Sequence, residues 1–145
     1  MIQTCLSAFV ASLGFGVIFN IHGRKLFVAA LCGGIGGLFY ALSLLLGISE
    51  AISLMIGAMA LSIASEIAAR GLKAPVTAFL VCALIPLVPG GGMYYTMLEM
   101  VNGDINQAIL LGVDTIVNAG SIAIGCTLIS ILARQFFTKD RGVSR

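Results

Sequence analysis

Residues 83–104 read ALIPLVPGGGMYYTMLEMVNGD, and the fold depends on this stretch. Pro86 and Pro89 have no backbone N–H to donate, and the three glycines at 90–92 bring conformational freedom without side chains to cover their amides. An unpaired peptide group is costly in hydrocarbon, so non-helical backbone persists there only where protein buries it or where it lines a wet cavity. We therefore predict a membrane helix broken at residues 86–92, with a binding site at the break.

The composition places the whole chain in a membrane. Of its 145 residues 59% are hydrophobic and only 10% are charged, whereas a soluble domain carries roughly 25% charged residues. The mean hydropathy is +1.10. A single transmembrane domain over residues 1–145 is therefore expected. The net charge of +2 is small, and no basic run with interleaved aromatic residues exists to follow phosphates, so nucleic acid is not expected as a partner.

The fold class predicted from hydropathy is an all-α membrane protein with five transmembrane helices. Each apolar stretch is long enough for the roughly 20 residues that a bilayer crossing needs. In the fourth, residues 75–88 extend only about 21 Å at 1.5 Å per residue, so a short helix from about Met93 to Val101 should complete the crossing after the break. The alternative is a re-entrant hairpin. The predicted spans cover residues 2–21, 26–46, 51–69, 75–102 (broken at 86–92) and 108–133, followed by a basic tail at 134–145.

The charged residues predict the orientation. All eight Lys and Arg residues lie in alternate connecting segments or in the tail, while the other connections hold Glu50, Glu99 and Asp104 instead. Basic loops stay in the cytoplasm, so the N-terminus should lie outside and the C-terminus inside. The basic residues are Arg24, Lys25, Arg70, Lys73, Arg134, Lys139, Arg141 and Arg145.

The first candidate site is the break itself. If a half-helix starts after the glycines, the free backbone N–H groups near Gly91, Gly92 and Met93 point into the break and carry partial positive charge. Such a helix end suits a carboxylate, as in transporters with discontinuous helices. The alternative is a proline kink that serves packing only. The predicted substrate-binding residues of this segment are Pro86, Pro89, Gly90, Gly91, Gly92, Met93 and Tyr94.

Asp114 is the second candidate, because it lies about 9 Å inside the last predicted span. A carboxylate at that depth is costly unless it is neutralised, paired or hydrated. Asn118 shares its helix face, one turn on, and is included among the predicted substrate-binding residues. Two hypotheses follow for Asp114: it binds the ammonium group of a substrate, or it carries a coupling proton, since burial favours the neutral form of a carboxyl group. Alternatively, it lies close enough to the interface to reach water.

Other residues have structural explanations. Glu66 and Arg70 have the spacing of a helical ion pair. Small residues at Gly33 and Gly37, in the stripe at positions 60, 64 and 68, and at Ser121 and Gly125 allow close helix contacts, either within the bundle or with another subunit.

No chemistry beyond binding is indicated. Each of the four cysteines lies singly in an apolar segment, and the one histidine, His22, lies in a loop. A metal site, a cofactor or a disulfide framework is therefore not expected. No catalytic motif is present, so an enzyme is not expected either.

Two segments carry a family resemblance. PLVPGGGMYYTMLEMVNGD at 86–104 and GFGVIFNIHGRKL at 14–26 resemble the membrane part of the threonine/serine exporter family, and more narrowly the small subunit of its split, two-gene form. The resemblance implies a bacterial inner-membrane secondary transporter that uses the proton gradient to export threonine and serine, or in one branch dicarboxylates such as succinate. Pro86, Pro89 and Gly90 match the family motif, whereas Asp114 comes from the reasoning above.

The resemblance also bears on partners. Fused members of the family carry an additional soluble region and a further set of helices, which these 145 residues lack. We therefore expect a large-subunit partner, with a homo-oligomer as the alternative. Competing functions are a structural or assembly protein of a membrane complex, and a channel or holin-like pore.

Overall fold

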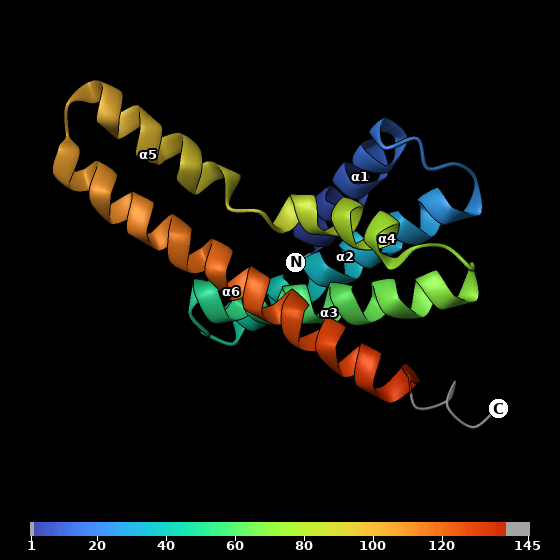
Figure 1. Ribbon diagram of the computed structural model, residues 1–145. Coiled ribbons are helices and arrows are strands. Elements are labelled where there is room, and N and C mark those ends of the chain that lie inside the picture. Colours follow the sequence, from blue (N-terminus) through green and yellow to red (C-terminus); the bar gives the residue numbers. More distant parts are fainter. Residues whose placement is uncertain (1, 139–145) are drawn as a thin grey trace.

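The computed structural model describes residues 2–138, and within them the secondary structure is entirely helical, as predicted (Figure 1). Most of the basic tail, including Lys139, Arg141 and Arg145, lies outside the described residues. The elements in order are α1 (Ile2–Ile18), α2 (Arg24–Leu45), α3 (Glu50–Gly71), α4 (Val76–Leu84), the 3-10 turn η1 (Ile85–Leu87), α5 (Gly90–Asn102) and α6 (Ile105–Thr138).

Three of the described helices, α2, α3 and α6, are each long and apolar enough to cross a membrane. A fourth crossing is added if α4 with η1 and α5 together count as one span, because the two parts are separated by a bend of 48°. α1 is apolar but has 17 residues and ends at Ile18, three residues before the predicted boundary. The chain is therefore a multi-pass helical protein with three or four candidate spans, and the fifth span stays a prediction.

The connection between α5 and α6 shows why this hairpin is tight. Gly103 ends α5 in the left-handed conformation with φ of 88°, where a residue without a Cβ is favoured. Asp104 follows, and its Oδ1 accepts the backbone N–H of Gln107 at 3.0 Å. This contact is a side-chain cap for the first turn of α6. A glycine that ends one helix and an aspartate that caps the next therefore turn the chain within two residues.

Small residues allow the helices to pack closely. A Cβ at Gly37 would lie 2.7 Å from the Cβ of Ala8 on α1, and a Cβ at Gly33 would clash with Ser12 on the same helix. Gly125 on α6 packs against α3, where an added Cβ would lie 2.8 Å from the Met55 carbonyl oxygen. The structure thus confirms packing within the bundle for the glycines at 33, 37 and 125. It also confirms the predicted ion pair, with Arg70 Nη2 2.9 Å from Glu66 Oε2.

The α5–α6 hairpin extends away from the remaining helices (Figure 1). No residue of α5 is buried, and its main packing partner is α6. α6 has 34 residues and is therefore about 51 Å long at 1.5 Å per residue. The α1–α2 and α3–α4 loops lie at the same side of the molecule in Figure 1, together with the C-terminal end of α6, and the α2–α3 and α5–α6 turns lie toward the other side.

Replacing Gly125 with valine tests the contact between α3 and α6. We expect Gly125→Val to lower the stability of the protein in detergent by about 1–3 kcal/mol, because the new side chain overlaps the Met55 backbone. Gly120→Val is the matched control, since nothing lies within 4 Å of a Cβ at that position of the same helix. Thermal unfolding of both variants measures the effect, and equal midpoints would contradict the packing.

Candidate functional site

The helix interruption consists of a 3-10 turn and a tight bend. The N–H of Val88 donates to the Ile85 carbonyl at 3.2 Å, and the N–H of Gly90 donates to the Val88 carbonyl at 2.7 Å. Pro89 occupies the N-cap position of α5, which begins at Gly90. The prediction that the glycines are non-helical and that the second helix starts near Met93 is therefore wrong by one turn. Once Pro89 has redirected the chain, nothing prevents glycine from adopting helical angles.

Two amides at this helix end have no partner in the helix. The N–H of Met93 donates to the Pro89 carbonyl at 3.2 Å, so the expectation that the Met93 amide is free is wrong. The N–H groups of Gly91 and Gly92 belong to the first turn, where the residues four positions back precede the helix and do not accept them. The positive end of α5 is thus concentrated at these two glycines.

One side of the break is anchored in the protein core. Leu87 is 5% exposed and packs in a cluster with Leu54, Leu61 and Ile122. Gly57 on α3 leaves room for it, because a Cβ at Gly57 would lie 3.0 Å from Leu87 Cδ2. The 3-10 turn is therefore packed against α3. On the other side of the break, Gly90 and Gly91 have open space where a side chain would be.

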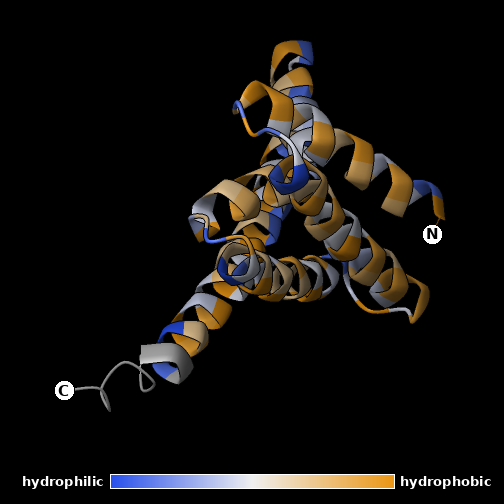
Figure 2. Cartoon of the chain, turned by 90° about the vertical axis from the view of Figure 1, so that its right-hand side faces the viewer, coloured by the Kyte–Doolittle hydropathy of each residue, from blue (hydrophilic) through white to orange (hydrophobic). Residues whose placement is uncertain are grey.

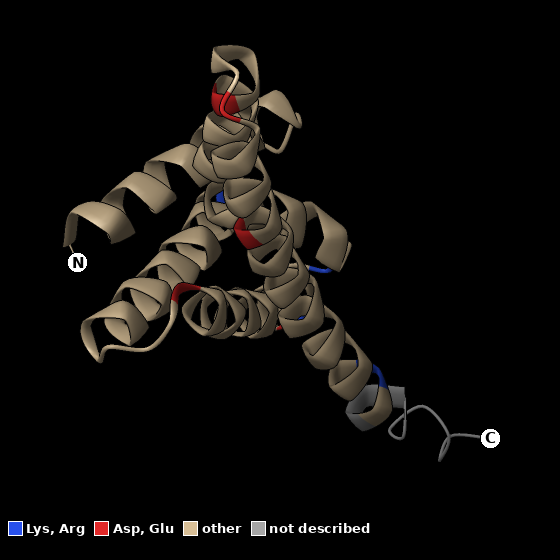
Figure 3. Cartoon of the chain, turned by 90° about the vertical axis from the view of Figure 1, so that its left-hand side faces the viewer, with Lys and Arg blue, Asp and Glu red and all other residues tan. Residues whose placement is uncertain are grey.

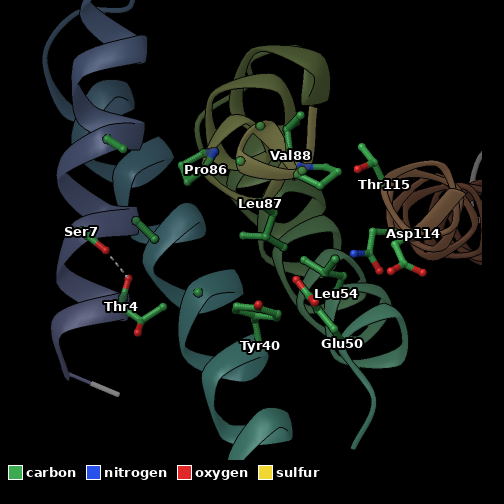
Figure 4. A pocket seen from close by; sticks show the side chains of 18 of the residues that line it. Thr4, Ser7, Tyr40, Glu50, Leu54, Pro86, Leu87, Val88, Asp114 and Thr115 are labelled. Carbon is green, nitrogen blue, oxygen red and sulfur yellow. Dashed lines mark hydrogen bonds between the residues drawn. The ribbon is translucent and has the colours of Figure 1, made fainter. Parts of the chain in front are cut away.

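The open side of the break faces a cavity of about 490 Å³ between α1, α2, α3 and α6 (Figure 4). This volume lies within the roughly 300–1,000 Å³ of typical small-molecule sites. Of the predicted site residues, Pro86, Pro89, Gly90, Gly91, Gly92, Asp114 and Asn118 line it. Met93 and Tyr94 do not line it and are 58% and 63% exposed.

The charged groups of the cavity are both acidic. Asp114 on α6 and Glu50 at the start of α3 line it, and its lining contains no Lys or Arg. Figure 4 places Asp114 on one side of the break and Glu50 near Tyr40 below it. Asp114 was expected to be buried, but its side chain is exposed in the isolated chain, because the α5–α6 hairpin stands away from the other helices. Figure 3 shows the molecule from the side of the α5–α6 hairpin, with acidic positions on that side.

Several lining residues were not among the predicted site residues. Glu50 and Tyr40 are the clearest, together with the hydroxyl-bearing Thr4, Ser7 and Thr115. The sequence contained one signal for Glu50, since it lies in a connection without basic residues, as do Glu99 and Asp104. Tyr40 faces the cavity only because α2 packs between α1 and α3, which hydropathy does not predict.

Thr115 of α6 lies against Gly92 in the first turn of α5. Its Oγ1 donates to the Leu111 carbonyl at 2.7 Å, and it lies where a Cβ on Gly92 would clash. From the neighbouring turn of α5, Thr96 Oγ1 donates to the Gly92 carbonyl at 2.7 Å. Both hydrogen bonds lie within a single helix, and the close approach of Gly92 to Thr115 is what packs the first turn of α5 against α6. Within the described residues, no three His, Cys, Asp or Glu side chains gather to hold a metal ion.

Several apolar helices of spanning length, packed around a cavity beside a helix interruption, define a multi-pass membrane protein. The family model for the threonine/serine exporter ThrE matches residues 4–132. The chain therefore belongs to the threonine/serine exporter family, a family of membrane transporters. No solved structure matches the chain.

Gly92→Ala tests the contact that fixes α5. We expect this variant to lower the thermal unfolding midpoint, because the new methyl group displaces Thr115 Oγ1 from its bond to Leu111. Gly91→Ala should leave the midpoint unchanged, since it meets open space. The double variant Gly92→Ala/Thr115→Ala should have an unfolding midpoint close to that of Thr115→Ala alone, because the clashing hydroxyl is gone. An effect of Gly91→Ala equal to that of Gly92→Ala would contradict this geometry.

Proposed function

We propose that this chain is the small subunit of a bacterial inner-membrane secondary exporter for threonine and serine. The observation that carries the proposal is the cavity in which the positive end of α5 and two carboxylates face the same space. A zwitterionic amino acid has an anionic group and a cationic group. The cavity offers a complementary partner to each.

The substrate carboxylate binds at the N–H groups of Gly91 and Gly92, where the helix dipole favours negative charge. The ammonium group binds at Asp114, with Glu50 as a second acidic group in the same cavity. Asn118 and Thr115 supply hydrogen-bonding groups for a substrate hydroxyl. Pro86 and Pro89 hold the break open, and the parts of Met93 and Tyr94 in binding stay predictions.

Asp114 also carries the coupling proton in this proposal. Protonation of Asp114 cancels the charge that attracts the ammonium group, so proton entry from outside favours substrate release there. The exposure of Asp114 to the cavity supports access for both substrate and proton. Antiport of protons against an amino acid follows from this competition for one carboxylate.

We propose five spans with the N-terminus outside and the C-terminus in the cytoplasm. α1 supplies the additional span, since 17 residues extend about 26 Å at 1.5 Å per residue, close to the roughly 30 Å of a hydrocarbon core. The fourth span is α4, η1 and α5 in sequence. The grouping of the two basic loops at one side of the molecule supports this topology.

The α5–α6 hairpin supports the proposal of a large-subunit partner. α5 forms one wall of the transport path but has no buried residue of its own. A partner with a further set of helices would cover it and close the cavity on that side. A second copy of this chain is the alternative occupant.

The amino acid and dicarboxylate functions differ in the charge that they require. A dicarboxylate needs two cationic partners, and the lining of this cavity includes Asp114 and Glu50 but no Lys or Arg. The second carboxylate of a dicarboxylate would face Asp114 and Glu50 without a cationic partner, which is unfavourable. This observation favours threonine and serine over succinate.

Exchange in proteoliposomes tests the proposal, with the chain reconstituted together with its large subunit. We expect unlabelled threonine or serine, but not succinate, to drive uptake of labelled threonine. Asp114→Asn should reduce exchange about tenfold or more, since a charge-assisted hydrogen bond is worth roughly 1.5–3 kcal/mol. Glu99→Gln is the matched control, because Glu99 lies on α5 but does not line the cavity. Exchange driven by succinate, or a fully active Asp114→Asn, would contradict the proposal.

A further inference from the structure

A second cavity, of about 560 Å³, lies between the α1–α2 loop and the α3–α4 loop. It shares no lining residue with the cavity at the helix break. Its polar lining carries basic groups and no carboxylate, and its apolar lining includes Leu72 and Phe79. The lining residues are Asn20, Ile21, His22, Arg24, Lys25, Leu72, Ala74, Pro75, Ala78 and Phe79.

The positive charges of this cavity are not neutralised by the described residues. Arg24 and Lys25 have no carboxylate partner within residues 2–138, and the ion pair on α3 joins Glu66 to Arg70, neither of which lines the cavity. Figure 2 looks at this side of the molecule and shows hydrophilic loop residues beside largely hydrophobic helices. An anionic group would compensate the charges of Arg24 and Lys25.

Two helices also begin at this cavity without a side-chain cap. α2 follows Gly23 and α4 follows Pro75, and neither N-cap residue makes a side-chain hydrogen bond to its helix. Pro75 and Ala78 of α4 and Arg24 and Lys25 of α2 line the space. The helix ends add partial positive charge to that of the side chains.

An apolar groove continues from the basic cavity along α4. The groove has a volume of about 260 Å³ and shares Ile21 and Ala78 with the basic cavity. From there it follows Val81 and Cys82, one turn further along α4, and Phe19 covers it from the α1 side. Thr77 adds one hydroxyl to this mainly apolar lining. The combined space is cationic at the loops and apolar toward the helices, which matches a ligand with an anionic head and a hydrocarbon tail.

We propose that the combined space binds one anionic phospholipid. Its phosphate contacts His22, Arg24 and Lys25, and an acyl chain lies in the groove between the end of α1 and α4. Basic pockets between helices at a membrane surface are suited to such head groups. A soluble phosphate would occupy the basic cavity but not the groove. The groove therefore favours a lipid over a soluble phosphate as the ligand. A bound lipid would connect α1, α2 and α4 at the opposite end of α4 from the helix break.

Native mass spectrometry of the purified 145-residue chain tests the proposal, because it resolves bound lipids by mass. We expect dioleoyl phosphatidylglycerol to bind with one saturable site, and dioleoyl phosphatidylcholine, which has no net charge, to bind at least tenfold more weakly. Arg24→Gln should raise the apparent dissociation constant for phosphatidylglycerol about tenfold. Lys73→Gln is the matched control, because it removes one charge from the α3–α4 loop without touching the cavity, and it should change the constant less than about twofold.

Glycerol phosphate, added as a competitor, separates the lipid from a soluble anion. We expect it to leave the bound phosphatidylglycerol in place at concentrations at which dihexanoyl phosphatidylglycerol competes. Displacement by glycerol phosphate as effective as by the lipid would overturn the proposal in favour of a soluble anion. If phosphatidylcholine binds equally well, or if Arg24→Gln and Lys73→Gln have equal effects, the proposal is wrong and the lipid binds nonspecifically. Circular dichroism of each variant checks that it is folded.

Discussion

The need to satisfy every backbone N–H inside a membrane governs this structure. Pro86 and Pro89 have no amide to donate, and Val88 and Gly90 use theirs in local turns at 3.2 and 2.7 Å. The amides of Gly91 and Gly92 remain without an acceptor in the helix. Because hydrocarbon offers no acceptor, such groups persist at membrane depth only beside protein or a polar cavity. The position of the cavity at residues 86–92 follows from this constraint.

The same constraint explains why the break is anchored so firmly. In a flexible break, the free amides could form hydrogen bonds to other nearby groups. The N–H groups at the start of α5 would then no longer point in one fixed direction. Leu87, buried over Gly57, fixes the 3-10 turn on one side, and Thr115 beside Gly92 fixes the first turn of α5 on the other. In the proposed function, the amides are thus held in place before the substrate binds, which would lower the entropic cost of binding.

The charges divide the molecule into two environments. The cavity at the break contains Asp114 and Glu50 with the positive end of α5, which suits a small zwitterion. The cavity at the other end of α4 contains His22, Arg24 and Lys25 beside an apolar groove, which suits an anionic amphiphile. α4 connects the two, so an occupant at one end of this short helix contacts the element that positions the other site.

Much of the fold could be predicted from the sequence, because hydropathy, small-residue spacing and i,i+4 charge pairs are local signals. The helical class, the glycine contacts of α2 and the Glu66–Arg70 pair are of this kind. The start of α5 could not be predicted, because glycine adopts helical and non-helical backbone angles and its presence in the sequence does not distinguish them. The roles of Glu50 and Tyr40 in the cavity depend on how α2 and α3 pack, and the exposure of Asp114 depends on the direction of the α5–α6 hairpin.

Cysteine accessibility at position 91 tests most directly whether the broken helix presents its free amides to a ligand. A single cysteine replaces Gly91 in a chain whose native cysteines are changed to alanine, and its labelling by a charged, membrane-impermeant thiol reagent is timed with and without threonine. We expect rapid labelling that threonine slows. Ile116, which is 73% exposed on an apolar face of α6, should stay unlabelled when it is replaced with cysteine. Labelling at position 91 as slow as at position 116, or unchanged by threonine, would contradict the account.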